Sequence, residues 1–314
     1  MTINADQLLN WTFEECIQTF TVRDTLFYAL SLGVGSDPYN RSHLKFVYEE
    51  GLVALPTLPM ILGWPGLWFS DPATGIDASA VVNVGQTLIV HSPCPVAATV
   101  SAQTRIVAVY DRGAGRGALV HLERLIRDQR TQGPIATVRS ALLCRNDGGF
   151  GGIAEPARSY EALPARAPDQ RVERATLAQA HLLYRLNGDR HPLHVNPDFA
   201  RSAGFSGPIL HGLATFGMVG HALVQAVCGD QPERRRELRA RFSAPFFPGE
   251  TLSIELWQDG ARVMFNAWSR ERRCKVLDQG YALVALSEPA SQPVYPSAEG
   301  ASPVDQADVS HRFR

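Results

Sequence analysis

The densest group of potentially reactive side chains lies at residues 184–194, which read YRLNGDRHPLH. Asp189 and His194 are five positions apart, so on a regular helix they would lie on different faces. Gly188 and Pro192 favour a turn instead, and a turn can bring both side chains to one point. A carboxylate beside an imidazole can orient a water molecule and exchange protons with it. The same residues also fit a surface turn in which Asp189 only caps nearby amides.

A second motif, PILHG at residues 208–212, directly precedes a strongly apolar stretch. The pattern predicts a helix from about His211 to Cys228, apolar on nearly all sides and therefore wrapped by other structure. N–H groups at a helix start are unpaired and carry partial positive charge. Because Gly212 has no Cβ, a carbonyl oxygen could lie against its N–H and form an oxyanion site. The alternative is ordinary helix packing at Gly212, with His211 as a buried core histidine.

Other chemistries receive less support from the sequence. The GFSGP run at 204–208 lacks the last glycine of a nucleophile elbow. The GAGRG run at 113–117 lies between two strand patterns and predicts a hairpin turn, not a dinucleotide-binding loop. The arginine-rich segment 234–241 is expected to be a solvated loop. We expect no cofactor and no metal, since HPLH matches no known ligand scaffold. The side chains that could in principle hold a metal are Asp189, His191, His194 and His211.

The chain contains an approximate internal repeat. Three pairs of motifs recur in the same order: TVRDTLFYAL with TLAQAHLLYRL, LPTLPM with LATFGM, and GQTL with GETL. Each copy is predicted to contain a short helix, a loop, a more apolar helix and several strands. Few long crossovers separate the strands, so the sheet should be mainly antiparallel and the fold class α+β. Strand patterns occur at 87–90, 100–110, 118–127, 135–144, 251–257, 262–269 and 281–286.

Composition sets the domain plan and limits the partners. A glycine-rich run at 148–152 predicts a first module at 1–152, a linker at 153–170, a second module at 171–287 and a disordered tail at 288–314. A formal net charge of −1 argues against nucleic-acid binding. The 5 scattered cysteines indicate no disulfide framework. We expect no membrane span, no signal peptide and a cytoplasmic location, because long apolar runs are absent.

The two motifs together resemble the MaoC-type, R-specific enoyl-CoA hydratase family (hydratase 2), in the two-module form of peroxisomal multifunctional enzymes. The segments 28–30, 44–49 and 55–57 are similar to the N-terminal half of that form. The resemblance implies a double hot-dog fold, in which each half wraps an antiparallel sheet around a long helix. It also implies syn addition of water to a trans-2-enoyl-CoA, giving a (3R)-3-hydroxyacyl-CoA.

The resemblance assigns roles by position. Asp189 and His194 would hold the water and exchange protons, and the Gly212 N–H would stabilise the enolate-like thioester oxygen. One departure is clear, because the family motif has Asn where this chain has His191. The further active-site or supporting positions are Tyr184, His191, His211, Glu49 and Tyr28.

The first half lacks the Asp–His and His–Gly motifs, and Pro59 and Pro65 interrupt its second helix. We therefore predict a single active site in the second half, with the first half enlarging the acyl pocket for bulky or long chains. An acyl-CoA thioester is the expected partner, and a homodimer the expected assembly. The alternatives are a hot-dog thioesterase, a dehydratase acting on carrier-protein thioesters, and a non-catalytic acyl-CoA-binding subunit.

Overall fold

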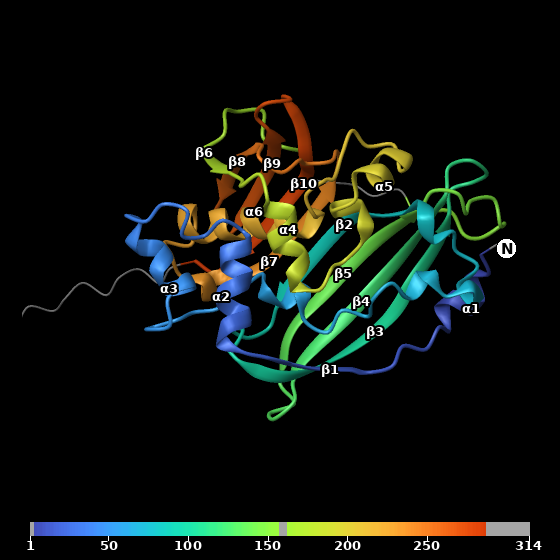
Figure 1. Cartoon of the computed structure of the whole chain (residues 1–314), viewed down its shortest axis with the longest axis horizontal. Coiled ribbons are helices and arrows are strands. Elements are labelled where there is room, and N and C mark those ends of the chain that lie inside the picture. The colour runs from blue at the N-terminus through green and yellow to red at the C-terminus, as the bar shows by residue number, and fades with distance from the viewer. Residues whose placement is uncertain (1–2, 157–161, 287–314) are drawn as a thin grey trace, which may run out of the picture.

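The ten strands in the described part of the chain belong to one antiparallel sheet, in the order β1-β3-β4-β5-β2-β7-β10-β9-β8-β6 (Figure 1). The computed structural model describes residues 3–156 and 162–286, so the predicted tail at 288–314 and part of the predicted linker lie outside the described residues. The strands are β1 (Cys16–Phe20), β2 (Val81–Val90), β3 (Ala98–Asp111), β4 (Ala118–Asp128), β5 (Pro134–Cys144), β6 (Gln170–Ala175), β7 (Arg235–Phe242), β8 (Thr251–Asp259), β9 (Arg262–Ser269) and β10 (Cys274–Val284).

The two halves of the chain meet where β2 pairs with β7. Leu88 lies opposite Leu238, and Gly85 lies opposite Arg241. The strands before residue 145 are contiguous on one side of this junction, and those after residue 169 are contiguous on the other. The halves therefore share one sheet, instead of the two separate sheets that the resemblance implies.

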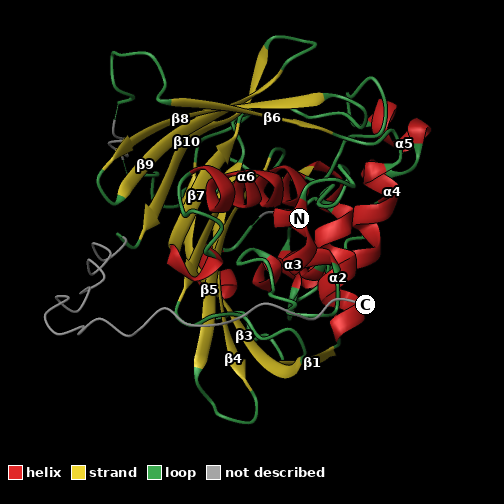
Figure 2. Cartoon of the chain, turned by 90° about the vertical axis from the view of Figure 1, so that its left-hand side faces the viewer, coloured by secondary structure: helices red, strands yellow, loops and turns green. Residues whose placement is uncertain are grey.

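The helix α6 (Gly212–Ala226) lies at the centre of the molecule, with β6 and β8 on one side and the strands of the first half on the other (Figure 2). This confirms the long apolar helix predicted from about residue 211. Its residues from Ala214 to Val224 are all buried. The other α-helices are α1 (Ala5–Leu9), α2 (Val22–Ser31), α3 (Leu44–Val47), α4 (Ala180–Tyr184) and α5 (Pro197–Ser202). Within the described residues, every helix is too short or too polar to cross a membrane.

The first half has no counterpart of α6, which corrects the expectation of a long helix in each half. After Thr57 the chain forms only the 3₁₀ turn Leu58–Ile61. Pro59 has no N–H to donate, and Pro65 disfavours helix at the residue before it. The interruption predicted from these prolines is thus confirmed, and the following segment is free to line a cavity.

The structure corrects the prediction for the arginine-rich segment. Residues 235–242 form β7 in the middle of the sheet, not a solvated loop. Arg235 is fully buried, and Leu238 and Ala240 are also buried. The strand patterns in the sequence did not predict β1 or β6. The hairpin turn at 113–117 is confirmed, since it joins β3 to β4 and its glycines have positive φ.

Candidate active site

Asp189, His194 and His211 converge at one point, although they come from different segments. Their carboxylate oxygen and ring nitrogens lie within 4.8 Å of one another. Gly188 allows the turn because its φ of 121° lies in a region that side chains rarely adopt. The Asp189 carboxylate accepts the N–H of His191 at 3.1 Å, which holds the turn closed.

The ring of His194 is fixed in one orientation. Its Nδ1 lies 2.9 Å from the carbonyl oxygen of Ile209, and a carbonyl can only accept, so Nδ1 carries the proton. The neutral ring then has its lone pair on Nε2. The rings of His194 and His211 stack at 3.7 Å between centroids. Burial lowers the pKa of His194, because the charged form would lose its hydration.

His211 is a second neutral imidazole, and its ring stacks on that of His194. Its Nε2 donates to the backbone oxygen of Asp189 at 3.2 Å, which links the two motifs. Burial, with the neighbouring His194, lowers the pKa of His211 to about 2. The ring of Tyr184 packs against His211 at 5.0 Å, and that of Tyr28 lies 6.3 Å from Tyr184. Both tyrosines are buried, and burial raises their pKa values.

Gly212 is the first residue of α6, and the structure leaves no room for a side chain there. A Cβ at this position would lie 2.9 Å from the ring of Phe242. Helix starts present unpaired, positively polarised N–H groups. Gly212 lines the same cavity as Asp189 and His194, so its amide can serve an oxygen bound beside them.

His191 stands where the family motif has Asn, and it performs a local task that Asn performs elsewhere. Its Nδ1 accepts the N–H of Leu193 at 3.2 Å, as an Asn oxygen does in an Asx turn. This bond caps the 3₁₀ turn Pro192–His194, which carries the candidate base. His191 also lines the cavity, and burial lowers its pKa.

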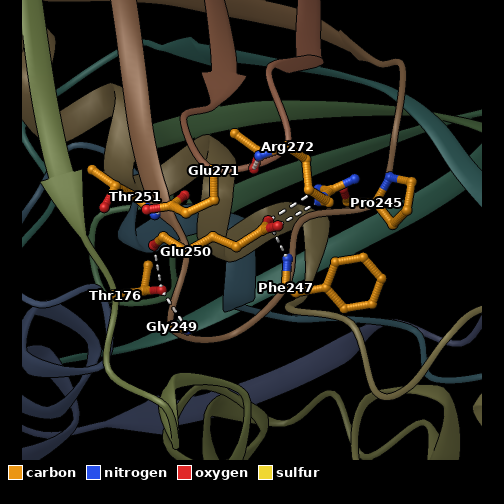
Figure 3. A network of polar contacts seen from close by, with 9 residues as sticks. Thr176, Pro245, Phe247, Gly249, Glu250, Thr251, Glu271 and Arg272 are labelled. Carbon is orange, nitrogen blue, oxygen red and sulfur yellow. Dashed lines mark hydrogen bonds and ion pairs between the residues drawn. The ribbon is translucent and has the colours of Figure 1, made fainter.

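A network of polar contacts centred on Glu250 holds the loop before β8 (Figure 3). Glu250 pairs with Arg272 and accepts the N–H of Phe247 at 2.9 Å. Phe246 in this loop accepts the N–H of Leu210 at 2.7 Å, two residues before Gly212. The Glu250 network therefore helps to position the PILHG motif.

A cavity of about 370 Å³ connects this cluster to the first half. Its second-half wall includes Asp189, His194 and Gly212. Its first-half wall comes from the 3₁₀ turn after Thr57, the loop that follows it and the inner face of the sheet. The first-half lining includes Met60, Trp64, Pro65, Leu67, Trp68, Gln86, Thr104, Leu122, Arg124 and Ser140.

Not every predicted site residue lies at this cavity. Glu49 is exposed in a turn and is not among the lining residues. Tyr28 and Tyr184 lie behind His211 instead of on the cavity wall. The sequence predictions omitted Arg124, although its position in an alternating strand pattern places it on the buried face of β4.

Asp189, His194 and His211 form the one group among the described residues with spacing suited to a metal ion. The geometry of the rings does not fit a shared ion. A metal lies in the plane of each ligating imidazole at about 2.0–2.1 Å. The two ring planes are only 23° apart and are stacked, so their lone pairs do not converge.

Comparisons with known proteins agree for both halves. The family model described as MaoC like domain matches residues 159–279, and the MFE-2 hydratase 2 N-terminal domain matches residues 18–146. An enoyl-CoA hydratase of Mycobacterium tuberculosis is 34% identical over 290 residues, covering 90% of this chain and 99% of that protein. The chain belongs to the MaoC-like hydratase 2 family.

Further comparisons agree with this assignment. The peroxisomal enoyl-CoA hydratase 2 of Arabidopsis thaliana is 32% identical, over 87% of this chain and 93% of the relative. A crystal structure of a MaoC-like dehydratase from Phytophthora capsici superposes with a TM-score of 0.79 at 30% identity, covering 91% of this chain and all of the other. A more distant Mycobacterium tuberculosis protein, 17% identical with a TM-score of 0.53, is described as a double hot-dog fold. The predicted α+β double hot-dog is thereby confirmed.

Proposed function

We propose that this chain is a hydro-lyase that adds water to trans-2-enoyl-CoA and forms (3R)-3-hydroxyacyl-CoA, reversibly, in acyl-CoA degradation. Relatives covering nearly its whole length are named enoyl-CoA hydratases. The observation that carries the proposal is the meeting of Asp189 and His194 beside the start of α6 in one cavity. These groups supply what hydration of a conjugated thioester needs.

The water is proposed to lie between the Asp189 carboxylate and Nε2 of His194. A water bonded to both groups can bridge about 5.6 Å, twice a hydrogen-bond length of roughly 2.8 Å, and the Asp189 carboxylate lies within 4.8 Å of a ring nitrogen of His194. Neutral His194 has an available lone pair on Nε2 and can accept a proton from the water. The water oxygen bonds to C3 of the substrate, and the proton returns from this couple to C2.

Gly212 is proposed to stabilise the charge that develops on the thioester oxygen. As the electron pair of the double bond moves toward the carbonyl, negative charge gathers on that oxygen. An N–H at the start of the 15-residue helix α6 faces it with the positive end of the helix dipole. A single donor of this kind contributes on the order of 10²–10³ in rate.

The catalytic groups and the acyl pocket are assigned to different predicted modules. Residues 171–287 are proposed to hold the catalytic groups, residues 1–152 to shape the acyl pocket, and 153–170 to link them. The interrupted helix after Thr57 leaves the first-half wall open to the cavity, which supports long or bulky acyl chains. A homodimer and a cytoplasmic location remain predictions.

The test is to follow the loss of enoyl-thioester absorbance with short and long trans-2-enoyl-CoA substrates, and to assign product chirality. Asp189→Asn should lower kcat by about 10²–10⁴, the usual contribution of a positioned acid–base group. The matched control is Asp198→Asn, since Asp198 is an exposed aspartate on the adjacent helix α5 that pairs with Arg201. Release of free CoA would instead identify a thioesterase. Unchanged hydration in Asp189→Asn would contradict the proposed site, and a preference for crotonyl-CoA would contradict the enlarged pocket.

A further inference from the structure

The first-half wall of the cavity contains a charged side chain that hydration does not require. Arg124 lies on β4 and is only 6% exposed, yet it lines the cavity that holds Asp189 and His194. Leu122 and Ile126, two positions to either side, are also buried on this face of the strand. An acyl pocket for plain hydrocarbon would place an apolar residue here.

The guanidinium of Arg124 has little compensation from the protein. Its Nη2 donates to the carbonyl of Met60 at 2.7 Å, while its buried Nε has no partner. None of the ion pairs found among the described residues includes Arg124. Burial lowers its pKa to about 10, so it remains charged at neutral pH. A buried cation without a counterion is costly, and an anionic ligand would offset that cost.

The cavity wall near Arg124 carries polar side chains next to apolar ones such as Val138, its partner on β5. Thr104 lies directly opposite it on β3, and Ser140 and Gln86 lie in the neighbouring row. All three line the cavity, and the Ser140 hydroxyl donates to Gln86 at 3.1 Å. The cavity wall from Arg124 toward β2 therefore offers hydroxyl and amide groups to an oxygen atom, between apolar side chains.

The strand that carries Arg124 is separated from the Gly212 end of the cavity by other strands. In the sheet order β4 is three strands from β7, whose Phe242 packs on Gly212. Three strand spacings amount to about 14 Å. We therefore place the group that meets Arg124 away from the thioester, toward the far end of the acyl chain.

We propose that Arg124 recognises a carboxylate at the distal end of the acyl chain, so that the preferred substrates are ω-carboxy-trans-2-enoyl-CoA thioesters. This rests on the proposed hydration and narrows its substrate class. A carboxylate matches the planar donors of arginine and supplies the missing counter-charge. A hydroxyl would supply an acceptor without the charge.

The chain offers a matched control in Arg235. This arginine is also fully buried, and its Nη2 donates to the carbonyl of Pro56 at 2.6 Å, in the same segment as Met60. It does not line the cavity. Replacing it removes a comparable buried charge and a comparable bond without touching the proposed carboxylate site.

The experiment compares enoyl-CoA substrates of matched length that end in methyl, hydroxyl or carboxylate, over a series of lengths. At the best length, the wild-type protein should have its highest kcat/KM with the carboxylate. Arg124→Met should lower kcat/KM for that substrate by about 10–100-fold, since a charge-assisted bond is worth roughly 1.5–3 kcal/mol. The same change should leave kcat/KM for the methyl substrate equal or higher.

The control variant Arg235→Met should change kcat/KM for the three substrates by the same factor. Arg124→Gln keeps a donor for Met60 and removes the charge, so it serves if Arg124→Met does not fold.

An equal loss of kcat/KM for all three substrates in Arg124→Met and Arg124→Gln would overturn the proposal, as would a wild-type preference for the methyl or hydroxyl substrate.

A binding measurement separates this outcome from failure of the hydration itself. Saturated acyl-CoA and ω-carboxyacyl-CoA can be titrated calorimetrically without turnover. A ratio of Kd values that favours the carboxylate and collapses in Arg124→Gln supports the site even if no hydration occurs, and equal Kd values refute it.

Discussion

The two nitrogens of His194 have different tasks because their surroundings differ. Nδ1 is bonded to the carbonyl of Ile209, so the lone pair of the neutral ring is on Nε2. The ring of His211 stacks on this imidazole, and burial opposes its protonation. The result is a base that stays neutral, where an exposed histidine would begin to be protonated.

This arrangement predicts the acid limb of the pH profile. A base must be deprotonated to act, and burial lowers the pKa of His194 below the ordinary value of 6.5. Activity should therefore persist as the pH falls through 6.5 and decline only at lower pH. The measurement is kcat/KM for an enoyl-CoA between pH 4.5 and 8. The variant His191→Asn should keep this limb, since His191 caps the turn without being the base. An acid limb at or above 6.5 in the wild-type protein would contradict the assignment.

Residue types and spacing suggested chemistry for Asp189 with His194 and for Gly212, and the resemblance to the hydratase 2 family predicted that the three belong together. Their motifs are local, with the turn-forming Gly188 and Pro192 in one and a helix start in the other. Glu49 was a different case, since its place depends on how a distant loop folds, and that loop leaves it exposed. Arg124 was missed because a charged residue in a strand is normally assigned to the solvent face.

At the scale of elements, α6 is positioned by close contacts at glycines. A Cβ on Gly220 would lie 2.5 Å from Cγ2 of Thr57, and one on Gly217 would lie 2.8 Å from the side chain of Leu32. Thr57 precedes the interrupted helix of the first half. The short 3₁₀ turn and the glycines of α6 thus let the two halves approach closely. This close approach sets the position of α6 and of Gly212 at its start.

Gly220→Ala should therefore destabilise the fold. Alanine favours a helix by about 0.8–1 kcal/mol over glycine, but overpacking typically costs about 1–3 kcal/mol. We expect a net loss of up to about 2 kcal/mol in the free energy of unfolding, measured by urea titration. Thr57→Ala removes the atom that clashes, so the double variant should show a favourable coupling energy between the two sites. Purely additive changes would show that Gly220 is not held by this contact.

The sequence patterns identified most strands but not β7, and the reason is physical. Arginines occupy both faces of this strand, Arg235 buried and Arg236 exposed, so the usual alternation of apolar and polar residues is hidden. Its central place depends on pairing with β2 and β10, which lie far away in the chain. The short strands β1 and β6 lie at the two edges of the sheet; β1 has only 5 residues, and β6 is mostly polar.

At the scale of the whole molecule, the halves share a sheet and a core that reaches from one half to the other. Neutral histidines are buried where they meet. His221 on α6 packs against the rings of His43 and Phe46 from the first half. Burial lowers the pKa of His221 to about 3. The assembled fold therefore depends on these rings staying uncharged.

That dependence predicts a loss of stability in mild acid. Above pH 6.5, His221 is neutral in both the folded and the unfolded chain and does not affect the balance. Below 6.5 the unfolded chain binds a proton that the folded chain does not, because the folded pKa is lower. Each such histidine lowers the free energy of unfolding by about 1.4 kcal/mol per pH unit. His221→Leu removes one of them, so the slope of stability between pH 6 and 4.5, from urea titrations, should be shallower than in the wild-type protein by about that amount. Parallel slopes would mean that the folded protein can accept a proton at His221, and that the contact between the halves tolerates charge.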